Sequence, residues 1–115
     1  MENKTVIKAL AALAQETRLA IFRLLVEHGP SGLPVGKIGE RLAIPPSTLS
    51  FHLKELDHAE LVIARQESRF IIYSANFSTI SRLIGFLTEN CCGAAPQNCV
   101  AACDPINEAK TGGTP

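Results

Sequence analysis

The chain has 115 residues, 46% hydrophobic and 19% charged, so it can build a core, and its length favours one small domain. Eleven Lys and Arg residues balance eleven Asp and Glu residues, giving a formal net charge of zero. This balance excludes a highly basic protein that coats nucleic acid without reading its sequence, but not a DNA reader with local positive groups. No apolar run approaches the ~18 residues of a membrane span, and the first residues lack a signal-peptide pattern. We therefore expect a soluble, cytoplasmic protein with no membrane partner.

The first third of the chain predicts two helices. Val6, Leu10 and Leu13 recur at the spacing of an amphipathic helix. A second helix is expected from about Glu16 to His28, with an apolar surface too broad for one stripe, which indicates a central buried helix. The segment Gly29–Pro34 is rich in Gly and Pro and predicts a break.

Two short helices joined by a tight turn are expected next. Apolar residues follow helical spacing from Val35 to Leu42, and Ala43-Ile44-Pro45 forms a short turn. Pro46 suits the first position of the following helix, where a missing N–H costs little. The inward row of that helix is Leu49, Leu53 and Leu56. This pattern is typical of a helix-turn-helix, although spacing alone fits any small helical bundle equally well.

The segment after these helices favours the helix-turn-helix. Two runs rich in Val, Ile, Phe and Tyr, Leu61–Gln66 and Arg69–Ser74, flank the two-residue connection Glu67-Ser68 and predict a hairpin. A last helix is expected from about Phe77 to Asn90. The expected fold is mainly α (α+β), a winged helix-turn-helix with about five helices and one two-stranded β-hairpin wing. Residues 1–90 would form the DNA-binding and dimerisation domain, and residues 91–115 a flexible cysteine-containing tail.

The recognition helix carries the candidate DNA contacts. Its polar or exposed candidates are Ser47, Thr48, Ser50, Phe51 and Lys54. Hydroxyl groups bond to base edges or phosphates, a lysine reaches a phosphate or guanine, and an aromatic ring contacts a thymine methyl. The plainer interpretation of the hydroxyl residues is ordinary polarity at a helix start. Arg69, beside the wing turn, is expected to contact phosphate, or else to lie on a solvated hairpin tip. For His52, beside the inward row, packing with a hydrogen bond is expected first and DNA contact second.

A single recognition helix contacts few base pairs, so we expect a homodimer on a palindromic double-stranded operator. The first and last helices are the candidates for pairing, because each has an apolar face outside the DNA-reading unit. Their alternative role is simple packing onto their own core.

The four cysteines lie within 13 residues near the C-terminus: Cys91, Cys92, Cys99 and Cys103. A disulfide framework would spread them through the fold, and a cytoplasmic chain would keep them reduced. Thiolates are soft ligands that select thiophilic centres over magnesium, calcium or manganese. The adjacent pair, with Cys99 folded back through a turn at Gly93 and Pro96, would supply three sulfurs.

Three motifs in order resemble the ArsR/SmtB family of metal-sensing repressors: Ser47–Leu56, Ala59–Val62 and Arg65–Tyr73. The upstream run Leu13–Phe22 also resembles that family, at the entry into its second helix. The resemblance covers roughly residues 6–90. It implies a dimeric winged-helix repressor that releases operator DNA when a metal or metalloid binds.

Two common sites of that family are absent here. The stretch Val35–Glu40 has no Cys-x-Cys pair, and the last helix has no histidine and only Glu89 as a carboxylate. The tail, with Glu89-Asn90-Cys91-Cys92 followed by Cys99, is similar to the arsenic-sensing branch. The resemblance thus implies trivalent arsenic (arsenite), or trivalent antimony (antimonite), as the inducer, held by Cys91, Cys92 and Cys99, with no permanently bound cofactor.

Other functions remain open at this point. The same cysteines could sense zinc or cadmium, or close a disulfide under oxidants, and the tail could lack a sensing role. An enzyme is not expected, because the chain has no Gly-rich phosphate loop and no acid or base gathered near a nucleophile in sequence.

Overall fold

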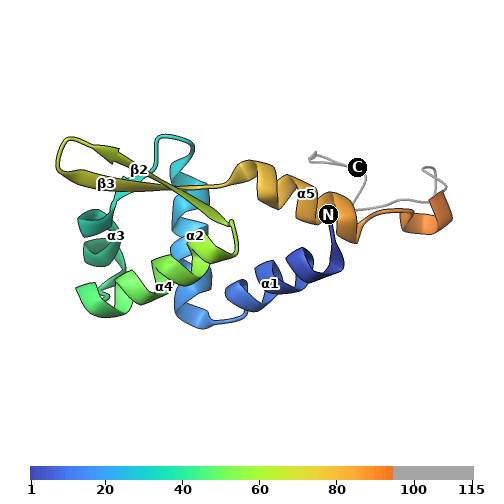
Figure 1. The fold of residues 1–115 in the computed structure, drawn as a ribbon, viewed down its shortest axis with the longest axis horizontal. Coiled ribbons are helices and arrows are strands. Elements are labelled where there is room, and N and C mark those ends of the chain that lie inside the picture. The colour runs from blue at the N-terminus through green and yellow to red at the C-terminus, as the bar shows by residue number, and fades with distance from the viewer. Residues whose placement is uncertain (95–115) are drawn as a thin grey trace, which may run out of the picture. The chain divides into compact units, whose positions relative to one another are not determined.

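A computed structural model describes residues 1–94. Its elements are α1 (Asn3–Leu13), α2 (Glu16–His28), β1 (Leu33–Pro34), α3 (Val35–Leu42), α4 (Pro46–His58), β2 (Val62–Glu67), β3 (Phe70–Ala75), α5 (Phe77–Leu87) and a 3₁₀ turn at Cys91–Ala94 (Figure 1). This order of helices and hairpin confirms the predicted winged helix-turn-helix. The chain forms two compact units, Met1–Leu83 and a second from Ile84 onward. The expected division between residues 90 and 91 stays a prediction.

Helix α2 is central to the first unit, as its broad apolar surface predicted. It begins after Gln15, whose side chain accepts a hydrogen bond from the backbone N–H of Arg18 at 2.8 Å, and it ends at Gly29 with a φ of 85°. Ile21, Phe22 and Leu25 are buried, and the helix packs against α1, α3, α4 and β3. The burial is not complete around the helix, since Leu19 and Val26 are exposed.

Helix α1 is amphipathic, as its spacing predicted, but alanines make up much of its buried face. The buried residues are Val6, Ala9 and Ala12, whereas Leu10 is 42% and Ile7 is 65% exposed. Small alanine side chains allow close packing of α1 against its neighbours, so the longer apolar side chains are left on the outside. Of the three apolar residues that predicted this helix, Val6 is thus buried, Leu13 is half-buried and Leu10 is exposed.

The sheet has one strand more than predicted. Its order is β1-β3-β2, with antiparallel pairing throughout the described residues. The last two residues of the predicted break form β1, where Leu33 pairs with Tyr73. Gly32 immediately precedes this pairing with a φ of 75°, and a Cβ there would lie 2.5 Å from the Tyr73 carbonyl oxygen. The backbones therefore approach so closely that only glycine fits.

The hairpin is shifted by one residue from the prediction. Its strands start and end one residue later, and the turn lies at Ser68-Arg69 with Ser68 in the left-handed region (φ 59°). A non-glycine residue accepts that conformation at modest cost, so the missing glycine did not prevent the turn. In Figure 1 the hairpin projects as an arm from the helical part of the first unit.

Helix α5 is shorter than expected, ending at Leu87 rather than near Asn90. Thr79 and Leu83 are buried, whereas the apolar side chains of Phe77, Ile84 and Leu87 are exposed. Asn90 has a φ of 58°, a left-handed conformation that an α-helix cannot continue through. Within residues 1–94, no helix is long and apolar enough to cross a membrane.

Candidate nucleic-acid interface

Helix α4 separates an inward and an outward face as its spacing predicted. Leu49 and Leu53 are each 2% exposed, and Leu56 is fully buried. Every candidate contact on this helix lies on the exposed side: Ser47, Thr48, Ser50, Phe51 and Lys54. Phe51 is 57% exposed, so its ring is open to a partner.

The angle between α3 and α4 is held by a tight turn. The Ile44 N–H donates to the Gly39 carbonyl oxygen at 3.0 Å, and Ala43 has a left-handed φ of 54°. A Cβ on Gly39 would lie 3.2 Å from both the Ile44 oxygen and a Leu49 methyl. The two helices therefore meet at van der Waals distance, which presents α4 at a defined angle.

Two arginines of the wing have different surroundings. The Arg65 guanidinium donates to a Glu67 carboxylate oxygen and to the Ser31 carbonyl oxygen, each at 2.8 Å. Arg69 is exposed, and within residues 1–94 it makes no hydrogen bond or ion pair. Arg65 is thus engaged in fixing the wing, and Arg69 is available for a phosphate.

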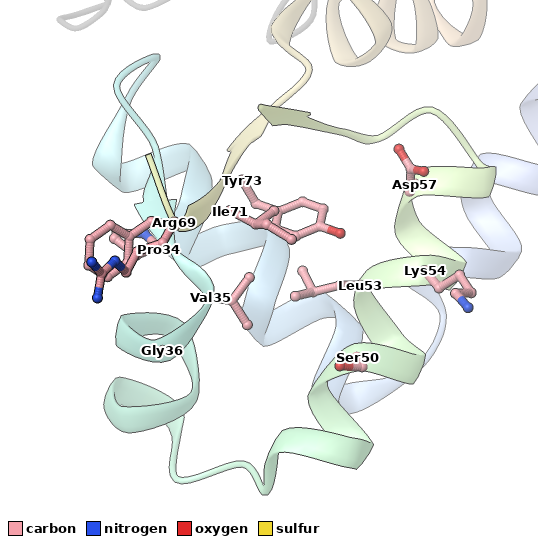
Figure 2. Close-up of a pocket in the computed structure, with 11 residues that line it drawn as sticks. Pro34, Val35, Gly36, Ser50, Leu53, Lys54, Asp57, Arg69, Ile71 and Tyr73 are labelled. Carbon is pink, nitrogen blue, oxygen red and sulfur yellow. The ribbon is translucent and has the colours of Figure 1, made fainter. Parts of the chain in front are cut away.

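A hollow of about 580 Å³ lies between α4 and the wing. Figure 2 shows Ser50 and Lys54 on α4 at one side and Arg69 on the wing at the other. Three of the predicted contacts from two elements therefore surround one depression, while Ser47, Thr48 and Phe51 lie elsewhere on α4.

Tyr73 and Asp57 also line this hollow, and the sequence analysis did not identify either. The Tyr73 ring lies between β3 and α4 (Figure 2). Burial, and to a lesser extent the Asp57 charge, raises the pKa of Tyr73 above its ordinary value. Its hydroxyl therefore remains protonated and can donate a hydrogen bond. Successive side chains of β3 alternate between the two faces of the sheet, and Tyr73 lies on the face toward α4. This alternation in the sequence could have identified Tyr73.

His52 is packed and hydrogen-bonded, which was the first of its two expected roles. It is 9% exposed, and its Nδ1 lies 3.3 Å from Nη1 of Arg18. Burial and then the Arg18 charge lower the pKa of His52, while Glu55 acts in the opposite direction. The imidazole is therefore neutral at physiological pH, with Nδ1 as the acceptor.

The adjacent cysteines lie in the 3₁₀ turn of the second unit. The Cys91 thiol donates to the Cys92 sulfur at 3.7 Å, and both Cys92 (φ 58°) and Gly93 (φ 67°) are left-handed. Burial and then the neighbouring Cys92 sulfur raise the pKa of Cys91. Cys99 and Cys103 lie outside the described residues. Within residues 1–94, no three His, Cys, Asp or Glu side chains are close enough to hold a metal ion.

The exposed second helix of a helix-turn-helix, flanked by a hairpin, defines a DNA-binding protein of the winged helix-turn-helix class. Comparison with known proteins agrees with this class. Residues 13–64 match the model of a helix-turn-helix domain family. The uncharacterized HTH-type transcriptional regulator YceK of Bacillus subtilis (strain 168) is 39% identical over 77 residues, covering 66% of this chain and 76% of the relative. The chain belongs to the helix-turn-helix transcriptional regulators, which are not enzymes.

Two solved structures relate the fold to ArsR-like regulators. An ArsR-like transcriptional regulator from Rhodococcus sp. RHA1 superimposes with a TM-score of 0.69 at 25% identity, covering 92% of this chain and 95% of that one. The homodimeric winged helix-turn-helix domain of Mb0332 from Mycobacterium bovis, a possible ArsR-family regulator, gives a TM-score of 0.62 at 28% identity. That match covers 74% of this chain and 76% of the other.

Proposed function

We propose that this regulator is a homodimeric repressor that binds a palindromic operator and is released by trivalent arsenic (arsenite), or by trivalent antimony (antimonite), bound to Cys91, Cys92 and Cys99. The observation that carries the inducer proposal is the 3.7 Å separation of the Cys91 and Cys92 sulfurs. Side chains of adjacent residues normally diverge, and the left-handed backbone at Cys92 brings these two sulfurs together. Cys99 would supply the third sulfur, and no cofactor is permanently bound.

The chemistry requires three thiols and no external oxidant or reductant. Arsenous acid reacts with three thiols so that three As–S bonds form, three As–O bonds break, and each thiol proton leaves with a hydroxide as water. The raised pKa of Cys91 keeps that thiol protonated at neutral pH. Arsenite binding then consumes and releases no protons, whereas a divalent metal must displace protons from the same thiols.

Operator recognition is supported by the outward face of α4 together with Arg69. In a dimer, two such helices would enter successive major grooves about 34 Å apart. Homodimerisation is supported by the exposed Ile7 and Leu10 of α1 and by the homodimeric state of the Mb0332 domain. Because the formal net charge is zero, affinity depends on a few placed donors rather than on an overall positive field.

The test is operator release by reduced protein, with arsenite, antimonite, zinc, cadmium or peroxide added alone. Arsenite is expected to release the operator at the lowest concentration. Cys91→Ser, Cys92→Ser and Cys99→Ser are expected to retain repression but need at least about tenfold more arsenite, equivalent to about 1.4 kcal/mol of lost binding. Cys103→Ser is the matched control and is expected to respond nearly normally.

The pH dependence of operator release distinguishes arsenite from a divalent metal as the inducer. Between pH 6 and 8 the arsenite response is expected to change little, while a cadmium response would strengthen as pH rises because protons are released. A Cys91→Ser/Cys92→Ser variant that leaves its operator at the wild-type arsenite concentration would show the site to be wrong. Release by peroxide alone, reversed by a reductant, would instead assign the thiols to redox sensing.

A further inference from the structure

The side chain of Arg18 joins three helices of the first unit. Arg18 lies in the first turn of α2, and its Nε donates to the carbonyl oxygen of Ala12 in the last turn of α1 at 2.7 Å. Its Nη1 lies 3.3 Å from Nδ1 of His52 on α4. All three helices also pack against one another, as α1 with α2, α1 with α4, and α2 with α4. One guanidinium therefore ties the end of α1 and the start of α2 to the middle of the recognition helix.

His52 lies within the DNA-reading segment of α4 but faces away from the predicted contacts. Its neighbours along the helix include Phe51 and Lys54, which are exposed. The Phe51 and His52 rings meet edge to face, with centroids 5.4 Å apart. A change in how His52 is held is thus transmitted directly to a side chain on the outward face.

We propose that Arg18 and neutral His52 form a positioning pair that orients the recognition helix for its operator, and that protonation of His52 breaks the pair and weakens specific binding. The imidazole accepts from Arg18 only through an unprotonated Nδ1. When that nitrogen gains a proton, two donors and two positive charges face each other across 3.3 Å in a nearly buried site. The contact then becomes repulsive.

The charges around His52 come from each helix that packs there. Arg18 on α2 opposes protonation, and Glu55 on α4 favours it. Lys8 on α1 and His58 on α4 line a neighbouring hollow together with Arg18 and Glu55. The burial of His52 and the charge of Arg18 outweigh Glu55, so the pKa of His52 lies below the ordinary value for histidine.

The Arg18–His52 pair also links α1 mechanically to the DNA-reading face of α4. Helix α1 exposes Ile7 and Leu10, and its last turn provides the carbonyl oxygen that holds the Arg18 guanidinium. A displacement of α1 would therefore reach His52 through a single side chain. This inference rests on operator binding, but it does not depend on the identity of the inducer.

The experiment uses a reference chain in which His52 is the one remaining histidine. The sequence has three histidines, so His28→Asn/His58→Asn provides that reference. Adding His52→Asn gives a matched chain whose side-chain oxygen can accept from Arg18 but cannot be protonated. At pH 8 the two chains are expected to bind the operator within about twofold. At pH 5 the reference is expected to have lost several-fold more affinity than the matched chain, because part of its His52 is then protonated.

An NMR titration of His52 in the reference chain, with and without operator DNA, gives a second readout. By linkage, if only neutral His52 supports specific binding, the operator must lower the pKa of His52. DNA phosphates near an imidazolium would raise that pKa, so the sign separates a positioning role from a direct contact. A raised or unchanged value, or equal pH profiles for the two chains, would overturn the proposal. If the wild-type chain binds no operator at pH 8 although it is folded, operator binding itself fails, which is a distinct result.

Fold stability must be followed in parallel. Because the pKa of His52 is lower in the folded than in the unfolded chain, stability is complete at high pH. It decreases as pH falls through the unfolded value near 6.5 and levels off below the folded value. Circular dichroism at each pH restricts the comparison to folded protein. Arg18→Met, which removes both contacts, is expected to weaken binding at pH 8 and to abolish the pH difference.

Discussion

At the scale of single residues, the two wing arginines have different expected roles although they lie four positions apart. Arg65 donates to the backbone of the loop before β1 and to Glu67, so its charge is partly used within the protein. The Arg65–Glu67 pair is solvent-exposed, with side-chain exposures of 40% and 57%, and such pairs contribute about 0–1 kcal/mol. The carbonyl contact therefore matters more to the position of the wing than the ion pair does.

Arg69→Ala is expected to weaken operator binding by a similar factor for specific and unrelated DNA, because a phosphate contact carries no sequence information. The slope of log affinity against log salt is expected to fall by about 1. Fluorescence anisotropy across a salt series measures both quantities. Arg65→Ala is the matched control, expected to change the salt slope by much less. An unchanged slope in Arg69→Ala would remove this residue from the interface.

At the scale of elements, α4 combines a buried face that supports the fold with an exposed face that has no structural role in the isolated chain. Its burial pattern followed directly from helical spacing. With 3.6 residues in each turn, Leu49, Leu53 and Leu56 can all be buried only if they lie on the same face of the helix. Apart from the contact between the Phe51 and His52 rings, the two faces can therefore be changed independently.

Lys54→Ala is expected to lower operator affinity while changing the free energy of unfolding by less than about 0.5 kcal/mol, since Lys54 is on the surface. Leu53→Ala, the neighbouring inward position, is expected to destabilise by about 2–5 kcal/mol through the cavity it leaves. Denaturant unfolding and anisotropy measured on both variants test this division. A large loss of stability in Lys54→Ala would mean that its aliphatic stem packs in the hollow.

The elements that were mispredicted share a physical cause. Strand β1 has two residues, too few for any periodicity, and exists because Gly32 allows its backbone to approach Tyr73. The buried face of α1 includes alanines. A search for spaced hydrophobic residues gives weight to longer side chains and therefore misses them. The Arg18–His52 contact joins residues 34 positions apart, and no local pattern indicates such a pair. Burial was thus predictable along α4, where three leucines form the inward row, and close backbone or polar contacts were not.

At the scale of the whole molecule, the exposed apolar side chains of α1 need an explanation. Ile7 is 65% exposed, and a leucine one turn away is exposed as well. Covering two such side chains stabilises an assembly by about 1.5–3 kcal/mol each. The proposed homodimer, built through α1, would cover both side chains.

Ile7→Glu and Leu10→Glu are expected to shift the protein to monomer at micromolar concentration, as measured by sedimentation. Operator affinity is expected to fall by more than about a hundredfold, because each half-site is then bound separately. Lys4→Glu, an exposed change on the same helix, controls for added negative charge. A monomeric wild-type chain that still binds its operator tightly would rule out the dimer.

The bond from Arg65 to the Ser31 carbonyl has a thermodynamic consequence for the whole complex. A hairpin arm joined to its body only by its own strands would have to be ordered when DNA arrives, at about 0.5–1.5 kcal/mol for each immobilised long side chain. Here the Arg65 bond already holds the wing in the free protein. The entropy cost of ordering the wing is therefore part of folding and is not part of DNA binding. Operator binding by the wing should accordingly carry a small entropy penalty, and its affinity can be adjusted through side chains without reshaping the arm.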